Sequence, residues 1–101
     1  MAIIELSVIP LGTETTSLSQ YVAQAVKILE NEKDVKYQLT PMGTVIEGEL
    51  AHILSLAQKM HESAFASGAM RVVTVMKIDD RRDKPSTMSA KVAAVKQKLQ
   101  G

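Results

Sequence analysis

The chain has 101 residues, of which 46% are hydrophobic, 23% charged and 3% aromatic, and its formal net charge is +1. These values predict a single folded domain over residues 1–101 and exclude an intrinsically disordered chain. The balanced charge gives no field that would steer the protein to nucleic acid or anionic lipid, and no apolar run approaches the roughly 20 residues of a membrane-spanning helix. The absence of cysteine and of a signal-peptide pattern at the start predicts a cytoplasmic protein.

The chain opens with a predicted β-strand over residues 2–9, which is rich in β-branched residues and is expected to stop at Pro10. Ser17 and Gln20 have the spacing of a capping box, which predicts the start of a helix that ends near Asn31. Apolar residues recur along it at helical spacing: Leu18, Tyr21, Val22, Ala25, Ile28 and Leu29.

A β-hairpin is predicted next, with strands over residues 35–40 and 44–49 and a turn over residues 41–43. A second helix is predicted over residues 50–65, and Gly68 follows it where a C-terminal capping glycine is expected. The residues expected on its buried stripe are Ile53, Ala57, Met60 and Ala64.

The last predicted elements are a strand over residues 70–78, a charged loop over residues 79–85 and a C-terminal helix. Met88, Val92, Val95 and Leu99 form the apolar stripe of this helix. The order β-α-β-β-α-β predicts an α+β, ferredoxin-like fold: a four-stranded antiparallel sheet with two helices on one face, plus the C-terminal helix.

The strand over residues 70–78 has apolar residues on both of its sides, whereas two helices can cover only one face of the sheet. Because monomers seldom expose large apolar patches, we expect the other face to be buried in a homodimer or homotetramer. The alternative is that the C-terminal helix folds back over this face.

Three polar side chains, those of Ser7, Gln38 and Thr40, are predicted to line the uncovered face. By strand alternation they point away from an apolar set consisting of Leu6, Val8, Tyr37 and Leu39. Polar groups inside an interface need hydrogen-bond partners. Bonds between subunits or to water would satisfy them, and a small polar ligand held between the sheets of two subunits is the second interpretation.

Other polar residues give weaker indications of function. His52 and His61 lie on opposite sides of one helix and cannot share a metal ion, so no metal site is predicted. No nucleophile or phosphate-loop motif predicts catalysis, and the two central strands lack the aromatic residues that bind RNA. Arg81 and Arg82 belong either to a solvated loop or to a contact with an anion or a neighbouring subunit.

Three segments, residues 5–12, 37–48 and 77–85, resemble the small thiamine-binding protein family, and the hairpin sequence LTPMGT over residues 39–44 is the most specific part of the resemblance. The resemblance covers nearly the whole chain. It implies a ferredoxin-like fold, assembly into dimers and tetramers, and binding of thiamine or its pyrimidine moiety without catalysis. Thiamine would then be a bound ligand, and no cofactor is expected.

An aminopyrimidine offers an acceptor nitrogen and an amino donor, which hydroxyl and amide side chains can bind. The expected ligand-binding residues on the uncovered face, near the hairpin turn, are Ser7, Gln38, Thr40, Met42, Thr44 and Glu47. The face to which Glu47 points depends on a hairpin register that the turn sequence leaves open. A structural homo-oligomer without a ligand and a small isomerase-type enzyme of the same fold are the alternative functions.

Overall fold

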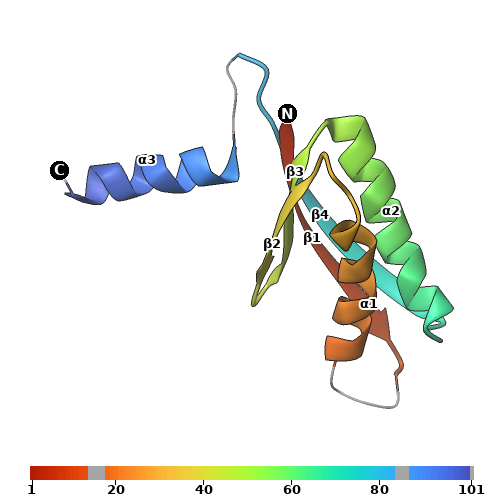
Figure 1. The fold of residues 1–101 in the computed structure, drawn as a ribbon. Helices are drawn as coiled ribbons and strands as arrows, with labels where there is room; N and C mark the ends of the chain where they lie inside the picture. Colours follow the sequence, from red (N-terminus) through yellow and green to blue (C-terminus); the bar gives the residue numbers. More distant parts are fainter. Residues whose placement is uncertain (14–17, 84–86, 101) are drawn as a thin grey trace.

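The computed structural model describes residues 1–13, 18–83 and 87–100. It consists of four strands and three helices in the predicted order (Figure 1). The elements are β1 (Ala2–Leu11), α1 (Ser19–Glu30), β2 (Lys36–Thr40), β3 (Gly43–Gly48), α2 (Leu50–Ala66), β4 (Arg71–Asp80) and α3 (Met88–Gln100). No described helix is long and apolar enough to cross a membrane.

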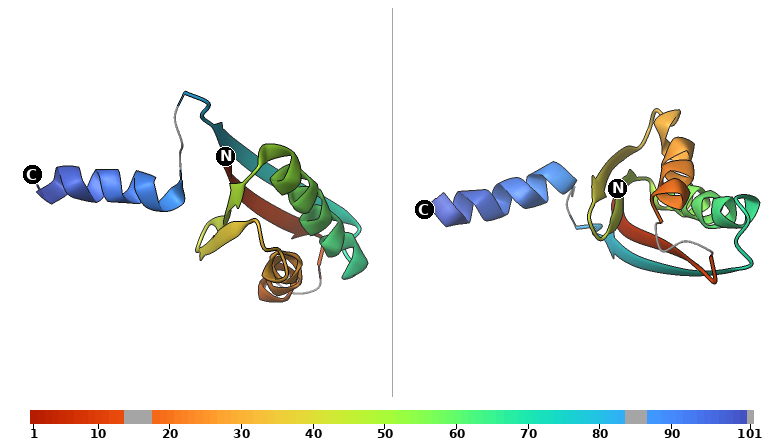
Figure 2. Two further views of the ribbon diagram at one scale, coloured as in Figure 1. Left: turned by 45° about the horizontal axis from the view of Figure 1, so that its top comes forward. Right: turned by 90° about the horizontal axis from the view of Figure 1, so that it is seen from below.

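The four strands form one antiparallel sheet in the order β2-β3-β1-β4. Strand β1 is central: it pairs with β4 along its whole length, but with β3 only over residues 2–6. Helices α1 and α2 cover one face of this sheet, and no helix lies flat on the other face, called the open face below (Figures 1 and 2). This arrangement confirms the predicted α+β, ferredoxin-like fold.

The hydrophobic core lies between α1, α2 and the covered face of the sheet. The predicted stripe of α2 is confirmed, because Ile53, Ala57, Met60 and Ala64 are all buried. The largest fully buried side chains of the core are Ile4, Leu6, Leu29, Ile46, Ile53, Leu56 and Met60. Burying each such side chain stabilises the fold by about 1.5–3 kcal/mol.

The sequence predicted a glycine cap at the end of α2 and a serine N-cap at the start of α1, and the structure describes only the first of these two residues. At the end of α2, Gly68 has a φ of +112°, and its N–H and that of Ala69 donate to the carbonyls of Phe65 and Ala64. This is the predicted glycine cap, of the Schellman type. At the start of α1 the N-cap residue is Leu18, without a side-chain cap; Ser17, the predicted N-cap, lies outside the described residues.

Strand β1 continues through Pro10 to Leu11, beyond its predicted end. Because β3 pairs with β1 no further than Leu6, the later part of β1 has a strand neighbour only on the β4 side. Such a half-paired segment accommodates proline, whose missing N–H would break a ladder in the middle of a sheet.

Helix α3 does not fold back over the open face, so that alternative is wrong. It projects from the open-face side of the sheet, away from α1 and α2 (Figures 1 and 2), and none of its residues is buried. The described chain is correspondingly elongated, with principal extents of 49, 29 and 21 Å. Apart from the contact between its first residues and Glu47, the helix leaves the open face uncovered in the single chain.

Candidate functional site

The sheet register assigns each predicted site residue to a face. Ser7 lies opposite Val75 and Gln38 opposite Val45, and both belong to the open face, as the sequence predicted. Thr40 and Glu47 lie on the same face by strand alternation. Directly opposed residues in antiparallel strands point to the same face, so this assignment follows from the pairing alone.

Thr44 lies on the covered face, opposite Leu6 of β1 and Leu39 of β2, so its predicted place among the open-face residues is wrong. The cause is the length of the hairpin turn. A three-residue turn over residues 41–43 would pair Thr40 with Thr44, but Thr40 pairs with Gly43, and the turn has only two residues. One residue of difference reverses the face to which Thr44 points.

Two hydroxyl groups hold the hairpin turn together and against β1. Thr40 Oγ1 accepts hydrogen bonds from the N–H groups of Met42 and Gly43, at 3.2 and 3.1 Å, and donates to the Gly43 carbonyl at 2.9 Å. Ser7 Oγ donates to the Met42 carbonyl at 2.8 Å. A Cβ on Gly43 would lie 2.7 Å from the carbonyl oxygen of Leu6, so only glycine permits this close approach.

A cavity of about 390 Å³ lies beside this turn, where β1 has lost β3 as its neighbour. Its walls come from the middle of β1, the hairpin turn, the first half of α1 and one residue of α2. The lining residues are Leu6, Ser7, Val8, Ile9, Leu18, Tyr21, Val22, Ala25, Leu39, Thr40, Pro41, Met42, Gly43, Thr44 and Met60. This volume is in the range of small-ligand sites.

Thr44 provides the most deeply placed polar side chain of the cavity. The residue is only 5% exposed, yet its hydroxyl makes no hydrogen bond with any other described residue. Because no buried side-chain oxygen of the described residues lacks a partner, this hydroxyl is accessible from the cavity, where a water or a ligand can bind it. Thr44 therefore presents a free hydrogen-bonding group inside an otherwise mostly apolar wall.

The cavity is electrically neutral within the described part of the chain, because none of its lining residues is charged at neutral pH. Its polar groups are the hydroxyls of Ser7, Thr40, Thr44 and Tyr21, and Met42 contributes a polarizable sulfur. Such a lining suits a planar heteroaromatic ring, which has apolar faces and a few hydrogen-bonding atoms at its edge.

The cavity thus brings together four of the six predicted ligand-binding residues: Ser7, Thr40, Met42 and Thr44. Gln38 instead lines a second hollow of about 310 Å³ between the open face and the start of α3. Sequence reasoning did not single out Tyr21 as a site residue, because its helical spacing placed it with the core residues of α1. The structure shows it half-buried in the cavity wall.

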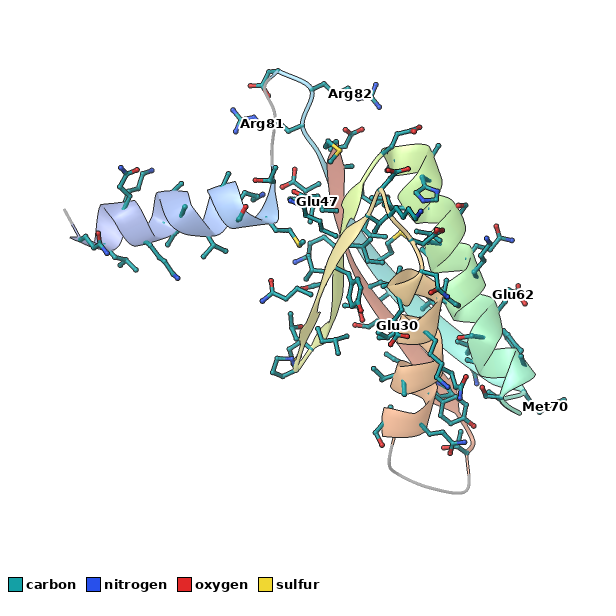
Figure 3. All side chains as sticks on the ribbon, viewed as in Figure 1. Glu30, Glu47, Glu62, Met70, Arg81 and Arg82 are labelled. Atoms are coloured by element: carbon teal, nitrogen blue, oxygen red, sulfur yellow. The ribbon has the colours of Figure 1, made fainter. Side chains whose placement is uncertain are left out.

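Glu47 has a structural role at the start of α3. The residue is 3% exposed, and its carboxylate accepts the N–H of Met88, the first residue of the helix, at 3.0 Å (Figure 3). Thr87 Oγ1 accepts the N–H of Ala90 in the same turn. A carboxylate is favourable at a helix N-terminus, where unpaired N–H groups and the helix dipole meet. Glu47 therefore fastens α3 to the sheet.

Arg81 and Arg82 lie near the end of β4 that pairs with Ala2, at the other end of the sheet from the hairpin turn (Figure 3). Each binds a carboxylate of its own segment: Arg81 pairs with Asp83 at 2.6 Å and Arg82 with Asp80 at 2.8 Å. The Arg82 hydrogen bond lowers the pKa of Asp80, and the Asp83 hydrogen bond raises the pKa of Arg81. Neither arginine lines the cavity.

The two histidines of α2, His52 and His61, contact different partners. His61 Nδ1 is 2.5 Å from the Thr74 hydroxyl, and its ring meets that of Phe65 edge-on, whereas His52 lies 3.7 Å from a carboxylate oxygen of Glu32. Over residues 1–13, 18–83 and 87–100, no group of three or more metal-ligating side chains comes together.

The sequence of this chain is similar to known proteins over nearly its whole length. The chain is 50% identical to the UPF0045 protein YqgV of Bacillus subtilis, an alignment that covers 99% of both chains. It is 46% identical to a UPF0045 protein of Methanothermobacter thermautotrophicus, covering 94% of this chain and 96% of that one.

Solved structures share the fold over nearly the whole chain. The crystal structure of protein MJ1052 from Methanocaldococcus jannaschii superposes with a TM-score of 0.84 at 37% identity, covering 93% of this chain and 94% of that one. Protein TM0486 of Thermotoga maritima, whose name suggests thiamine biosynthesis or salvage, has a TM-score of 0.77 at 22% identity, with 93% and 97% covered. At that identity the likeness concerns the fold alone. A family model described as thiamine-binding protein matches residues 4–96, and the chain therefore belongs to the thiamine-binding protein family.

Proposed function

We propose that this protein binds thiamine or a related aminopyrimidine, without catalysing a reaction, in the cavity between α1, β1 and the β2–β3 hairpin. The observation that carries the proposal concerns Thr44, a residue that is 5% exposed and lines the cavity, and whose hydroxyl makes no hydrogen bond with another described residue. Membership of the thiamine-binding family supports the choice of ligand.

The lining matches the chemistry of an aminopyrimidine ring. The hydroxyl of Thr44 can donate to a ring nitrogen or accept from the amino group, and Ser7 Oγ keeps its acceptor capacity while donating to the turn. Apolar side chains such as Leu39 and Val22 would contact the ring faces, and the Met42 sulfur suits an aromatic edge. The ligand position proposed here is therefore on the α1 side of the hairpin rather than on the open face.

A binding role is favoured over an enzymatic one by the same lining. General acid–base catalysis needs a group whose pKa lies near the working pH. None of the described lining residues carries a carboxylate, an imidazole or an amine, the groups that most often perform this role. The family description also names a binding activity.

Titration calorimetry with thiamine, its separate pyrimidine and thiazole parts and thiamine monophosphate tests the proposal. We expect saturable binding of thiamine and of the pyrimidine, and none of the thiazole. Removing the Thr44 hydroxyl by Thr44→Val should weaken binding roughly ten- to hundredfold, the effect of one lost buried hydrogen bond of about 1–3 kcal/mol.

His52→Ala is the matched control, because His52 lies on α2 outside the cavity lining and should leave the affinity unchanged. If no compound binds to the parent protein, the proposed function is wrong. If thiamine binds equally well to the parent, to Thr44→Val and to Ser7→Ala, the function stands but the cavity is not its site.

A further inference from the structure

Strand β1 has an unpaired backbone edge beside the cavity. Strand β3 pairs with β1 only as far as Leu6, whereas β4 follows β1 on its other side through Leu11. The part of β1 that follows Leu6 therefore has no strand neighbour on the β3 side, where the hairpin diverges from β1 (Figure 1). Three of its residues, Ser7, Val8 and Ile9, line the cavity. An unpaired strand edge presents N–H and C=O groups that can bind another molecule.

The position of Leu6 shows which backbone groups point to this edge. A Cβ on Gly43 of β3 would lie 2.7 Å from the Leu6 carbonyl oxygen, and Leu6 pairs directly with Thr44, so the Leu6 carbonyl points toward β3. In an antiparallel sheet, residues two positions apart direct their N–H and C=O groups to the same side. The N–H and C=O of Val8 consequently point to the β3 side, where they meet the cavity instead of a strand. No described residue outside the strand ladders is hydrogen-bonded to either group.

Pro10 gives independent support for this direction and shortens the edge. The pairing of β1 with β4 runs unbroken through Pro10 and Val72, so no bulge reverses the alternation. Proline is accepted in a strand where its nitrogen faces no partner strand, and Pro10 faces the same side as Val8. Within β1, the Val8 N–H is therefore the only donor on this side beyond Leu6. A peptide strand needs a row of donors and acceptors, so this short edge suits a small molecule instead.

We propose that the backbone of Val8 binds the edge of the ligand ring on which a ring nitrogen lies next to an amino group. This inference rests on the function proposed above and names the groups that recognise the ring. The Val8 N–H donates to the ring nitrogen, and the amino group donates to the Val8 carbonyl. The N–H and C=O of one extended residue point the same way, as do the lone pair of the ring nitrogen and the N–H of the adjacent amino group. The two edges are therefore complementary.

One ring can contact both Val8 and Thr44. Thr44 lies directly opposite Leu6, and Val8 lies two residues further along β1, a distance of about 7 Å. A six-membered ring between them reaches the Val8 backbone with one edge and leaves the Thr44 hydroxyl for another polar atom of the ligand. The backbone of Val8 thus selects an amino group next to a ring nitrogen, and Thr44 adds a separate hydrogen bond.

Amide hydrogen exchange of the parent protein, measured by NMR, tests the inference directly. Without ligand, the Val8 N–H should exchange faster than those of Ser7 and Ile9, which face β4. Saturation with the hydroxymethyl aminopyrimidine that forms part of thiamine should slow the Val8 exchange at least about tenfold. An analogue with a carbon in place of the ring nitrogen beside the amino group should leave it fast. A Val8 amide that is already slow without ligand, or whose exchange stays fast when calorimetry shows the aminopyrimidine bound, would overturn the inference.

Two variants at the same position isolate the N–H group. Val8→Pro deletes the N–H, whereas Val8→Ala removes the valine side chain and keeps the N–H. With both folded by circular dichroism, Val8→Pro should bind the aminopyrimidine roughly ten- to hundredfold more weakly than Val8→Ala in titration calorimetry.

The outcomes separate this inference from the function on which it rests. Equal affinities of the two variants mean that the inference is wrong and the proposed function stands. If Val8→Pro does not fold, the exchange of the parent Val8 amide decides. A parent that binds neither thiamine nor the aminopyrimidine refutes the proposed function and the inference together.

Discussion

Replacing Thr44 by valine should weaken ligand binding and leave the stability of the protein nearly unchanged. The hydroxyl makes no hydrogen bond with another described residue, so its removal deletes no such bond from the folded chain. Valine keeps the β-branched shape at a position that is 5% exposed. We therefore expect the free energy of unfolding to change by less than about 1 kcal/mol and the affinity to fall by about 1–3 kcal/mol.

Thr40→Val provides the contrasting case on the same hairpin. The Thr40 hydroxyl makes three hydrogen bonds within the turn, and all three are lost in the variant. At about 0.5–1.5 kcal/mol for each bond, reduced by partial exposure, we expect a loss of about 1–3 kcal/mol in stability. For a domain of this size each kcal/mol lowers the melting temperature by about 4–8 °C.

Thermal unfolding followed by circular dichroism and titration calorimetry with thiamine separate the two effects. The expected pattern is normal stability with weak binding for Thr44→Val, and reduced stability for Thr40→Val whatever its affinity. A clear drop in the melting temperature of Thr44→Val would refute the reasoning, because it would mean that the hydroxyl stabilises the ligand-free fold.

Further predictions concern the turn, the charged loop and the anchor of α3. Gly43→Ala should destabilise the protein by about 1–3 kcal/mol in urea unfolding, since the new Cβ would collide with the Leu6 carbonyl. Because the Asp80 pKa is lowered in the folded state, its pairing with Arg82 stabilises the fold above about pH 4 and is lost as the pH falls through the lowered pKa. Arg82→Ala should raise the Asp80 pKa in an NMR titration. Glu47→Ala should speed amide hydrogen exchange in the first turn of α3 and leave β3 protected.

The order of elements and most of the core could be predicted from hydrophobic periodicity, because β-branched alternation and the 3.6-residue repeat are properties of short segments. Ile53 and Met60 are buried as their spacing predicts. The same signal overstated the burial of α1, where Val22 is 43% exposed and lines the cavity. Periodicity shows which side of a helix faces the protein, but not whether that side meets packed atoms or a cavity.

Two features of the site could not be predicted from the sequence pattern of a single segment. The length of the hairpin turn decided the face of Thr44, and a Pro-Met-Gly sequence is compatible with two or three turn residues. The burial of Glu47 depends on a helix that starts 41 positions later in the chain. Both are consequences of pairing between segments, which only the folded chain reveals.

Strands β1 and β3 stop pairing at Leu6 and Thr44, so the tip of the β2–β3 hairpin extends beyond the paired core. The length of the hairpin can therefore be changed without altering the core. The fully buried residues of β1 and β3, Ile4, Leu6 and Ile46, lie within the paired segment, whereas Pro41 and Met42 lie beyond it. Adding one residue to each hairpin strand would extend the cavity wall by about 3.3 Å and keep every core pair in register. Binding proteins for larger or smaller rings could therefore be made from this scaffold by changing the hairpin length alone.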